Sequence, residues 1–154
     1  MKRILFVCHG NICRSPMAEF VMKDIVHSHG RARDYHIESA AVSGEEEGNP
    51  VYPPVRQLLG SLGISCGGKR ARRIYADDYY DYDLIVAMDR SNLRYLERIL
   101  PSADRTRLLM EYAGQSRDVA DPWYTGDFET CYRDILLGCR SLFDALEKSG
   151  SGAW

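Results

Sequence analysis

The first twenty residues constrain the fold of this chain more than any other stretch. Four apolar residues, Ile4 to Val7, run directly into a short polar loop, and Ser15-Pro16 then opens an amphipathic segment. The apolar run predicts a buried strand, and a serine N-cap followed by proline predicts the start of a helix. A loop between a strand and a helix aims backbone N–H groups and the positive helix end at one point. Such a point suits an oxyanion such as phosphate.

Segments with strand and helix patterns alternate along the rest of the chain. Strands are expected over 35–42, 83–88 and 107–110, and helices over 53–62, 91–100 and 127–149. This alternation predicts a three-layer α/β fold of the doubly wound, flavodoxin-like kind, with a parallel sheet between helices. In such sheets ligands bind beyond the carboxyl ends of the strands, which is where the first loop begins.

Length and composition narrow the class of protein. With 154 residues, the chain is expected to form one domain over 1–154, with 150–154 as a loose tail. A net charge of -2 gives no support to nucleic-acid binding, and no apolar run is long enough to cross a bilayer. The apolar run after Lys2 and Arg3 is too short for a signal peptide. We therefore expect a cytoplasmic protein without membrane insertion, whose five cysteines are reduced.

The spacing of Cys8 and Arg14 predicts cysteine chemistry on a phosphate. The two residues bracket five others within the loop. A cysteine attacks as its thiolate, which is favoured at helix N-termini and beside cations. The planar guanidinium of Arg14 could bind two phosphoryl oxygens. Gly10 permits a close backbone approach, and the Ser15 hydroxyl could hydrogen-bond the sulfur.

Other interpretations of the loop remain open on the residues alone. Cys8 could be an ordinary buried thiol, and Arg14 could form a surface ion pair. A metal site built from Cys8, His9 and Cys13 is a further alternative, although no second Cys/His pair accompanies it.

A family resemblance points to one of these alternatives. The stretch Val7-Cys8-His9-Gly10-Asn11-Ile12-Cys13-Arg14-Ser15-Pro16 resembles the signature of the low-molecular-weight protein tyrosine phosphatases. Asp121-Pro122-Trp123-Tyr124 resembles the family's general-acid loop, and shorter stretches at 39–41, 48–50 and 87–93 are also similar. The resemblance implies a four-stranded parallel sheet flanked by helices. It also implies a two-step hydrolysis of phosphotyrosine through a phosphocysteine, without a metal or another cofactor.

The resemblance also implies roles for single residues. Cys8 would be the nucleophile, Arg14 the phosphate clamp and Asp121 the acid that protonates the leaving phenolate and later activates water. Cys13 would form a reversible disulfide with Cys8 under oxidation. The phosphate-binding loop would comprise His9, Gly10, Asn11, Ile12, Cys13 and Ser15, in which Asn11 shapes the loop and Ser15 supports the thiolate.

Asp121 is also favoured by its own surroundings. A tyrosine leaving group needs an acid, and Pro122 restricts the preceding residue to extended conformations. Asp118 and Asp127 are the rival carboxylates in the same segment. The simplest alternative is that Asp121 only caps a turn.

The wall of the expected cleft departs from the family pattern. Trp123, Tyr124 and Glu46 are expected to line it, but the loop over 44–48 holds three glutamates and no aromatic residue. Many family members have an aromatic side chain there. Lys69 stands where some members have a histidine that supports the loop.

Three rival functions share this scaffold or this chemistry. The resemblance assigns protein-arginine phosphatases a threonine where this loop has Ile12, so an apolar Ile12 favours an aryl phosphate. A thiol-dependent arsenate reductase would need extra thiols arranged to pass a disulfide outward from Cys8, but Cys66 has no close cysteine partner and Cys131 and Cys139 are expected to be buried. A phosphate-binding module would need no nucleophile. We therefore expect a monomeric enzyme that acts on phosphotyrosine-containing proteins.

Overall fold

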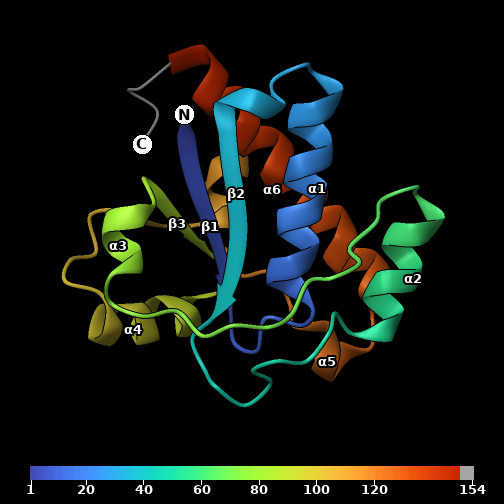
Figure 1. Ribbon diagram of the computed structural model, residues 1–154, viewed down its shortest axis with the longest axis horizontal. Helices are drawn as coiled ribbons and strands as arrows, with labels where there is room; N and C mark the ends of the chain where they lie inside the picture. The colour runs from blue at the N-terminus through green and yellow to red at the C-terminus, as the bar shows by residue number, and fades with distance from the viewer. Residues whose placement is uncertain (150–154) are drawn as a thin grey trace.

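The computed structural model describes residues 1–149, so the expected tail over 150–154 lies outside the described residues. Four parallel strands form one sheet in the order β2-β1-β3-β4 (Figure 1). The strands are β1 (Lys2–Cys8), β2 (Tyr35–Ala41), β3 (Leu84–Ala87) and β4 (Thr106–Leu108). The expected parallel sheet is therefore confirmed.

Helices cover both faces of the sheet, as a doubly wound fold requires. On one side lie α1 (Arg14–Ser28), α2 (Pro53–Ser61) and α6 (Phe128–Ser149), and on the other lie α3 (Asp78–Asp81) and α4 (Arg90–Ile99) (Figure 1). A short helix, α5 (Pro122–Thr125), precedes α6, and two 3-10 turns, η1 (Ala32–Asp34) and η2 (Leu109–Ala113), follow α1 and β4. Within residues 1–149, no helix is both long and apolar enough to cross a membrane.

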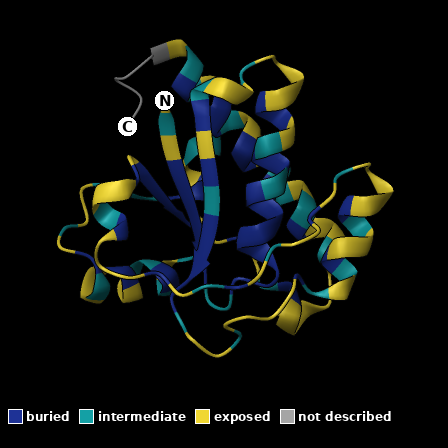
Figure 2. Ribbon diagram, viewed as in Figure 1, coloured by how far each residue is buried: buried dark blue, intermediate teal, exposed yellow. Residues whose placement is uncertain are grey.

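Alternation along β1 divides the core in two. Ile4 and Phe6 belong to the larger apolar cluster, which contains α1 and α6, whereas Leu5 and Val7 belong to the smaller cluster with α4. All four side chains are fully buried, and the ribbon of β1 is dark blue beyond its first residues (Figure 2). A strand that is buried on both faces has consecutive apolar residues, which explains the unbroken apolar run from which β1 was predicted.

The carboxyl ends of the strands meet at one edge of the sheet. Cys8 pairs with Ala41, Val7 with Ala87, and Ala87 with Leu108. The chain leaves β1 for β2 on one side and later returns to β3 on the other, so β1 lies at the switch in strand order. The loop that follows Cys8 therefore occupies the place where such sheets bind ligands.

Three details of the expected secondary structure are wrong. Helix α1 begins at Arg14, with Cys13 at the N-cap position, so Ser15 does not cap it. Met110 lies in η2 instead of a strand, and 122–125 form helix α5 where a loop was expected. In the last case Pro122 occupies the first helical turn, for which its fixed φ is suited.

Gly138 allows helix α6 to approach η2 closely. A β-carbon added at this position would lie 2.5 Å from Cγ and 2.9 Å from Cδ1 of Leu109. Leu109 is fully buried, so it has little room to move.

We expect Gly138→Ala to lower the free energy of unfolding by about 1–3 kcal/mol, because an extra methyl group overfills this contact. Chemical denaturation followed by circular dichroism measures the change. Gly60→Ala is the matched control, since Gly60 lies in α2 with nothing within 4 Å of an added β-carbon. That control should be neutral or stabilising by up to about 1 kcal/mol. Equal effects of the two substitutions would contradict the packing argument.

Candidate active site

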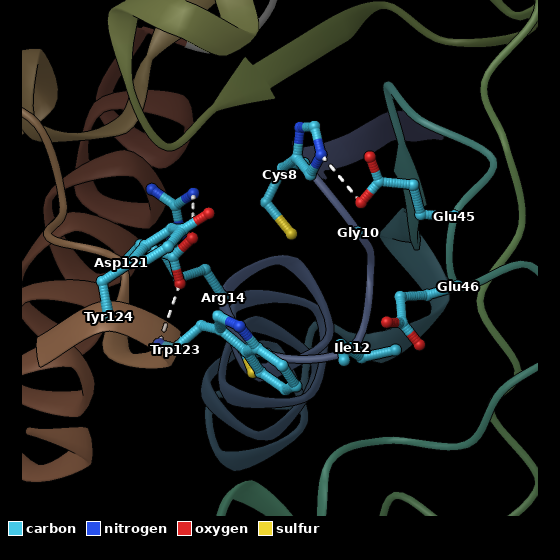
Figure 3. A pocket seen from close by; sticks show the side chains of 11 residues that line it. Cys8, Gly10, Ile12, Arg14, Glu45, Glu46, Asp121, Trp123 and Tyr124 are labelled. Atoms are coloured by element: carbon cyan, nitrogen blue, oxygen red, sulfur yellow. Dashed lines mark hydrogen bonds and ion pairs between the residues drawn. The ribbon is translucent and has the colours of Figure 1, made fainter. Parts of the chain in front are cut away.

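A small cavity of about 150 Å³ opens at the carboxyl edge of the sheet. Three segments that are far apart in the sequence line it. They are the loop after β1 (Cys8, His9, Gly10, Ile12, Cys13 and Arg14), the loop after β2 (Glu45 and Glu46) and the start of α5 (Asp121, Trp123 and Tyr124). Figure 3 shows the sulfur of Cys8 between the α5 residues on one side and the two glutamates on the other. The structure thus brings the predicted site residues together.

The sulfur of Cys8 is surrounded by hydrogen-bond donors. The backbone N–H groups of Asn11 and Ser15 point to Sγ at 3.3 and 3.4 Å, and Ser15 Oγ lies 3.0 Å away. Cys8 is 3 % exposed, so these donors replace most of its contact with water. Donors and a helix N-terminus directed at one sulfur can stabilise negative charge on it.

Asn11 shapes the loop through its backbone and its amide. Within residues 1–149, it is the one non-glycine residue with a positive φ, at 60°. Its buried amide donates to Ser15 Oγ at 2.8 Å and to Ser39 Oγ at 2.9 Å. These bonds offset the strain of the left-handed backbone, which asparagine tolerates better than most residues.

The amide of Asn11 also decides where the Ser15 hydroxyl points. Because Ser15 Oγ accepts a hydrogen bond from Asn11, its own proton is available to donate. The nearest acceptor is Cys8 Sγ at 3.0 Å, and the carbonyl oxygen of Ala40 is farther away at 3.5 Å. An ionised sulfur is also the stronger acceptor, so Ser15 donates to the thiolate.

Arg14 is held in the cavity by fixed acceptors. Its Nη1 donates to Asp89 Oδ2 and to the Val119 carbonyl, both at 2.8 Å, and its Nη2 lies 3.4 Å from Asp121 Oδ2. Burial works to lower the pKa of Arg14, but the negative charges of Cys8 and Asp89 outweigh it and raise that pKa. Arg14 therefore stays a cation with a fixed orientation.

Asp89 was not predicted as a site residue. It caps α4, where its Oδ1 accepts from the N–H of Asn92 at 2.7 Å while its Oδ2 binds Arg14. The only sequence signal was the family-like stretch over 87–93, which carried no role for this carboxylate.

Asp121 both caps a helix and faces the cavity. Its Oδ1 accepts from the N–H of Trp123 at 3.0 Å, and its Oδ2 is the atom near Arg14. Its backbone is extended, with φ -78° and ψ 113°, as Pro122 predicts. The rival carboxylates do not line the cavity, since Asp118 pairs with Arg90 and Asp127 caps the start of α6. Asp121 therefore caps the turn, as the simplest alternative proposed, and it also lines the cavity.

The rim of the cavity is aromatic on one side and acidic on the other. Trp123 and Tyr124 are exposed, and Tyr52 supports Trp123 with ring centroids 4.9 Å apart. Glu46 lies over Gly10, where its Cγ would be 3.4 Å from an added β-carbon, and its carboxylate accepts from Asn49.

His9 and Glu45 complete the acidic side of the rim. They form an exposed pair with Nε2 and Oε2 3.4 Å apart. Glu45 was not among the predicted site residues, although the run of three glutamates was the signal for it.

Cys13 lies beside Cys8 in the cavity lining as a neutral thiol. Burial raises its pKa, and the nearby negative charge of Cys8 adds to this effect. All five cysteines are free in the structure, so the disulfide between Cys8 and Cys13 stays a prediction.

A buried polar layer supports the loop from below. Ser39 Oγ donates to Glu19 Oε1 at 2.6 Å, and the ammonium group of Lys69 lies 3.3 Å from the same carboxylate. Lys69 Nζ also donates to the Ser39 carbonyl at 2.8 Å. Burial lowers the pKa of Lys69, while Glu19 opposes this shift. Lys69 therefore supports Asn11 through Ser39 and does not contact it directly.

The side chains that line the cavity are not arranged as a metal site. Among residues 1–149, no group of three or more His, Cys, Asp or Glu side chains is arranged to hold one, and this includes Cys8, His9 and Cys13.

Comparisons with known proteins place this geometry in one family. The family model described as low molecular weight phosphotyrosine protein phosphatase matches residues 3–151. The low molecular weight protein-tyrosine-phosphatase YfkJ of Bacillus subtilis is 37% identical over 152 residues, with 96% of this chain and 97% of that protein covered. The human low molecular weight phosphotyrosine protein phosphatase is 37% identical over 150 residues, covering 93% and 94%.

Solved structures agree with the sequence comparisons. The crystal structure of YfkJ matches with a TM-score of 0.94 at 36% identity, covering 97% of each chain. The crystal structure of a Drosophila arginine phosphatase matches with a TM-score of 0.88 at 34% identity, covering 97% of this chain and 99% of that one.

We expect Ser15→Ala to slow the alkylation of Cys8 by iodoacetamide about tenfold at mildly acidic pH, since a hydrogen bond to a charged sulfur is lost. Mass spectrometry after trypsin digestion measures modification of Cys8. Ser28→Ala, at the far end of α1, is the matched control because its hydroxyl donates only to the Asp24 carbonyl. An unchanged rate in Ser15→Ala would show that the hydroxyl does not stabilise the thiolate.

Proposed function

Because the chain belongs to the low molecular weight phosphotyrosine protein phosphatases, we propose that it hydrolyses phosphotyrosine in protein substrates. The observation that carries this proposal is the convergence of Cys8, Arg14 and Asp121 on one small cavity. A nucleophile, an anion clamp and an acid are the three parts that an aryl phosphate ester requires.

In the first step the thiolate of Cys8 attacks phosphorus. The sulfur–phosphorus bond forms as the bond to the phenolic oxygen breaks. Arg14 and the loop N–H groups bind the phosphoryl oxygens and stabilise the charge that they carry in the transition state. Protonated Asp121 gives its proton to the departing phenolate, so tyrosine leaves as a neutral phenol.

In the second step a water molecule replaces the sulfur. Asp121, now ionised, takes a proton from the water as its oxygen attacks phosphorus. The sulfur–phosphorus bond breaks and inorganic phosphate leaves. The Ser15 hydroxyl and the two loop N–H groups stabilise the thiolate that is released, which makes Cys8 a better leaving group.

The cavity wall supports an aryl substrate. Ile12 and Trp123 contribute apolar side chains to the cavity lining, and an aromatic ring packs favourably against an indole. The narrow cavity accepts a phosphate at the end of a flat ring.

Phosphoarginine is the second candidate substrate. A Drosophila arginine phosphatase shares the fold, and Glu45 and Glu46 place two carboxylates where a guanidinium could meet them. Ile12 in the cavity lining offers that group no hydrogen bond, so the aryl ester remains the favoured substrate.

The remaining thiols do not support arsenate reduction. Cys66, Cys131 and Cys139 are buried, and none of them lines the cavity. Burial raises the pKa of Cys131 to about 12 and that of Cys139 further, so both are neutral thiols. Because these three thiols lie outside the cavity, none of them is placed to receive a disulfide from Cys8.

We also propose that the chain acts as a single phosphatase domain over 1–154, as a monomer in the cytoplasm. One chain supplies every residue that lines the cavity, so no second copy is needed to complete it.

We expect Asp121→Asn to lower kcat for phenyl phosphate by about a hundredfold or more, because the leaving phenolate loses its acid. The loss for p-nitrophenyl phosphate should be smaller, since that leaving group needs less protonation. Asparagine is a good N-cap, so α5 is retained. Asp118→Asn is the control, and Cys8→Ser should abolish turnover. Equal losses for the two esters would contradict the acid role of Asp121.

We expect peptides with phosphotyrosine to be hydrolysed with a higher kcat/KM than matched peptides with phosphoarginine. Release of inorganic phosphate from both peptides measures the preference. Ile12→Thr, which adds a hydroxyl beside the sulfur, should shift the ratio toward phosphoarginine. A preference of the native chain for phosphoarginine would overturn the proposed substrate.

A further inference from the structure

The buried amide of Asn11 has an orientation that one backbone group determines. Its Oδ1 accepts a hydrogen bond from the N–H of Arg72 at 3.2 Å. If the amide were turned over, its NH2 group would face that N–H, and two donors would meet. The N–H of Arg72 therefore keeps Nδ2 directed at Ser15 and Ser39.

Turning the amide over would change both serines. Ser15 Oγ would then face an acceptor, so its proton would go to Asn11 and no longer to Cys8 Sγ. Ser39 would likewise turn its proton from Glu19 to Asn11. The thiolate would lose one of its three donors, although no residue that lines the cavity had changed.

The position of the Arg72 N–H depends on an ion pair outside the cavity. The guanidinium of Arg72 binds Asp78 through two hydrogen bonds, Nη1 to Oδ2 and Nη2 to Oδ1, both 3.1 Å long. Asp78 is 1 % exposed and also accepts from the N–H of Tyr75 at 3.0 Å. The Asp78 carboxylate, at the start of α3, thus binds both the side chain of Arg72 and the backbone of Tyr75, and so fixes the segment over 72–75.

Backbone hydrogen bonds on either side of Arg72 do not by themselves fix its N–H, which leaves a role for the Arg72–Asp78 ion pair. The N–H of Ala41 donates to the Arg72 carbonyl at 2.8 Å, which fixes the peptide plane that follows Arg72. The plane that carries the Arg72 N–H is held by Gly48, whose N–H donates to the Ala71 carbonyl at 2.8 Å. Gly48 is exposed, whereas the Arg72 side chain is 33 % exposed and ends on the buried carboxylate of Asp78, which anchors that plane from the protein interior.

We propose that the Arg72–Asp78 ion pair is a positioning device for the reaction, because it keeps the Arg72 N–H on Asn11 and so directs the Ser15 hydroxyl at the Cys8 thiolate. The inference rests on the proposed function for its effect on turnover. The effect on Cys8 itself is independent of any substrate.

Asp78→Asn tests the proposal because it removes the charge and keeps the shape of the side chain. We expect alkylation of Cys8 by iodoacetamide at mildly acidic pH to slow by about three- to tenfold, since a hydrogen bond to the sulfur is weakened. For p-nitrophenyl phosphate, kcat should fall by a similar factor while KM changes by less than about twofold, because Arg14 still binds the phosphate.

A double substitution separates positioning from general loosening of the structure. In the Ser15→Ala background, Asp78→Asn should change the alkylation rate by less than about twofold, since the hydroxyl through which it acts is gone. A full additional loss in that background would overturn the proposal, as would an unchanged alkylation rate in Asp78→Asn alone.

Two further variants keep the test decisive. Asp134→Asn breaks a surface pair in which Arg117 also binds through two nitrogens, and it should leave alkylation and turnover unchanged. If Asp78→Asn does not fold, Arg72→Lys keeps the charge but loses the two-nitrogen contact, and the same measurements apply. A chain that shows the alkylation effects but does not hydrolyse aryl phosphates would contradict the proposed function and leave the positioning role supported.

Discussion

The hydrogen bonds that converge on the Cys8 sulfur are the interaction on which the rest of the site depends. Two backbone N–H groups and one hydroxyl reach the same atom, and all three come from the loop and the first turn of α1. To present them, the loop adopts a left-handed backbone at Asn11, and the helix begins at Arg14. The Ser15 hydroxyl therefore bonds the Cys8 sulfur and does not cap α1. The helix loses a stabilising cap, and the loop gains a donor to the sulfur.

The sheet makes this arrangement rigid. Cys8 is the last residue of β1, a strand that is paired on both sides and buried on both faces. The polar layer beneath the loop continues the support through Ser39 and Glu19 to Lys69. Groups held in this way need little reorganisation when a phosphate binds, which is the main electrostatic advantage of a preformed anion site.

The sequence predicted the parts of this protein that depend on local patterns. Periodicity located the strands and the long helix α6, and the spacing of Cys8 and Arg14 indicated the chemistry. Asp89 and Arg72 were missed as site supports because their partners lie 75 and 61 residues away in the sequence. Pairing at such a distance follows from the fold and leaves no local pattern. Helix α5 was missed because four residues are too few to show a period.

The double role of Asp121 has a consequence for molecules designed to block the cavity. One oxygen of its carboxylate holds the first turn of α5, and the other faces Arg14. The backbone of the first turn of α5 and the Asp121 carboxylate, the proposed acid, are therefore coupled. A compound that displaces this turn to gain space will also move the carboxylate. Inhibitors that fit beside the indole will leave the first turn of α5, and with it the Asp121 carboxylate, in place.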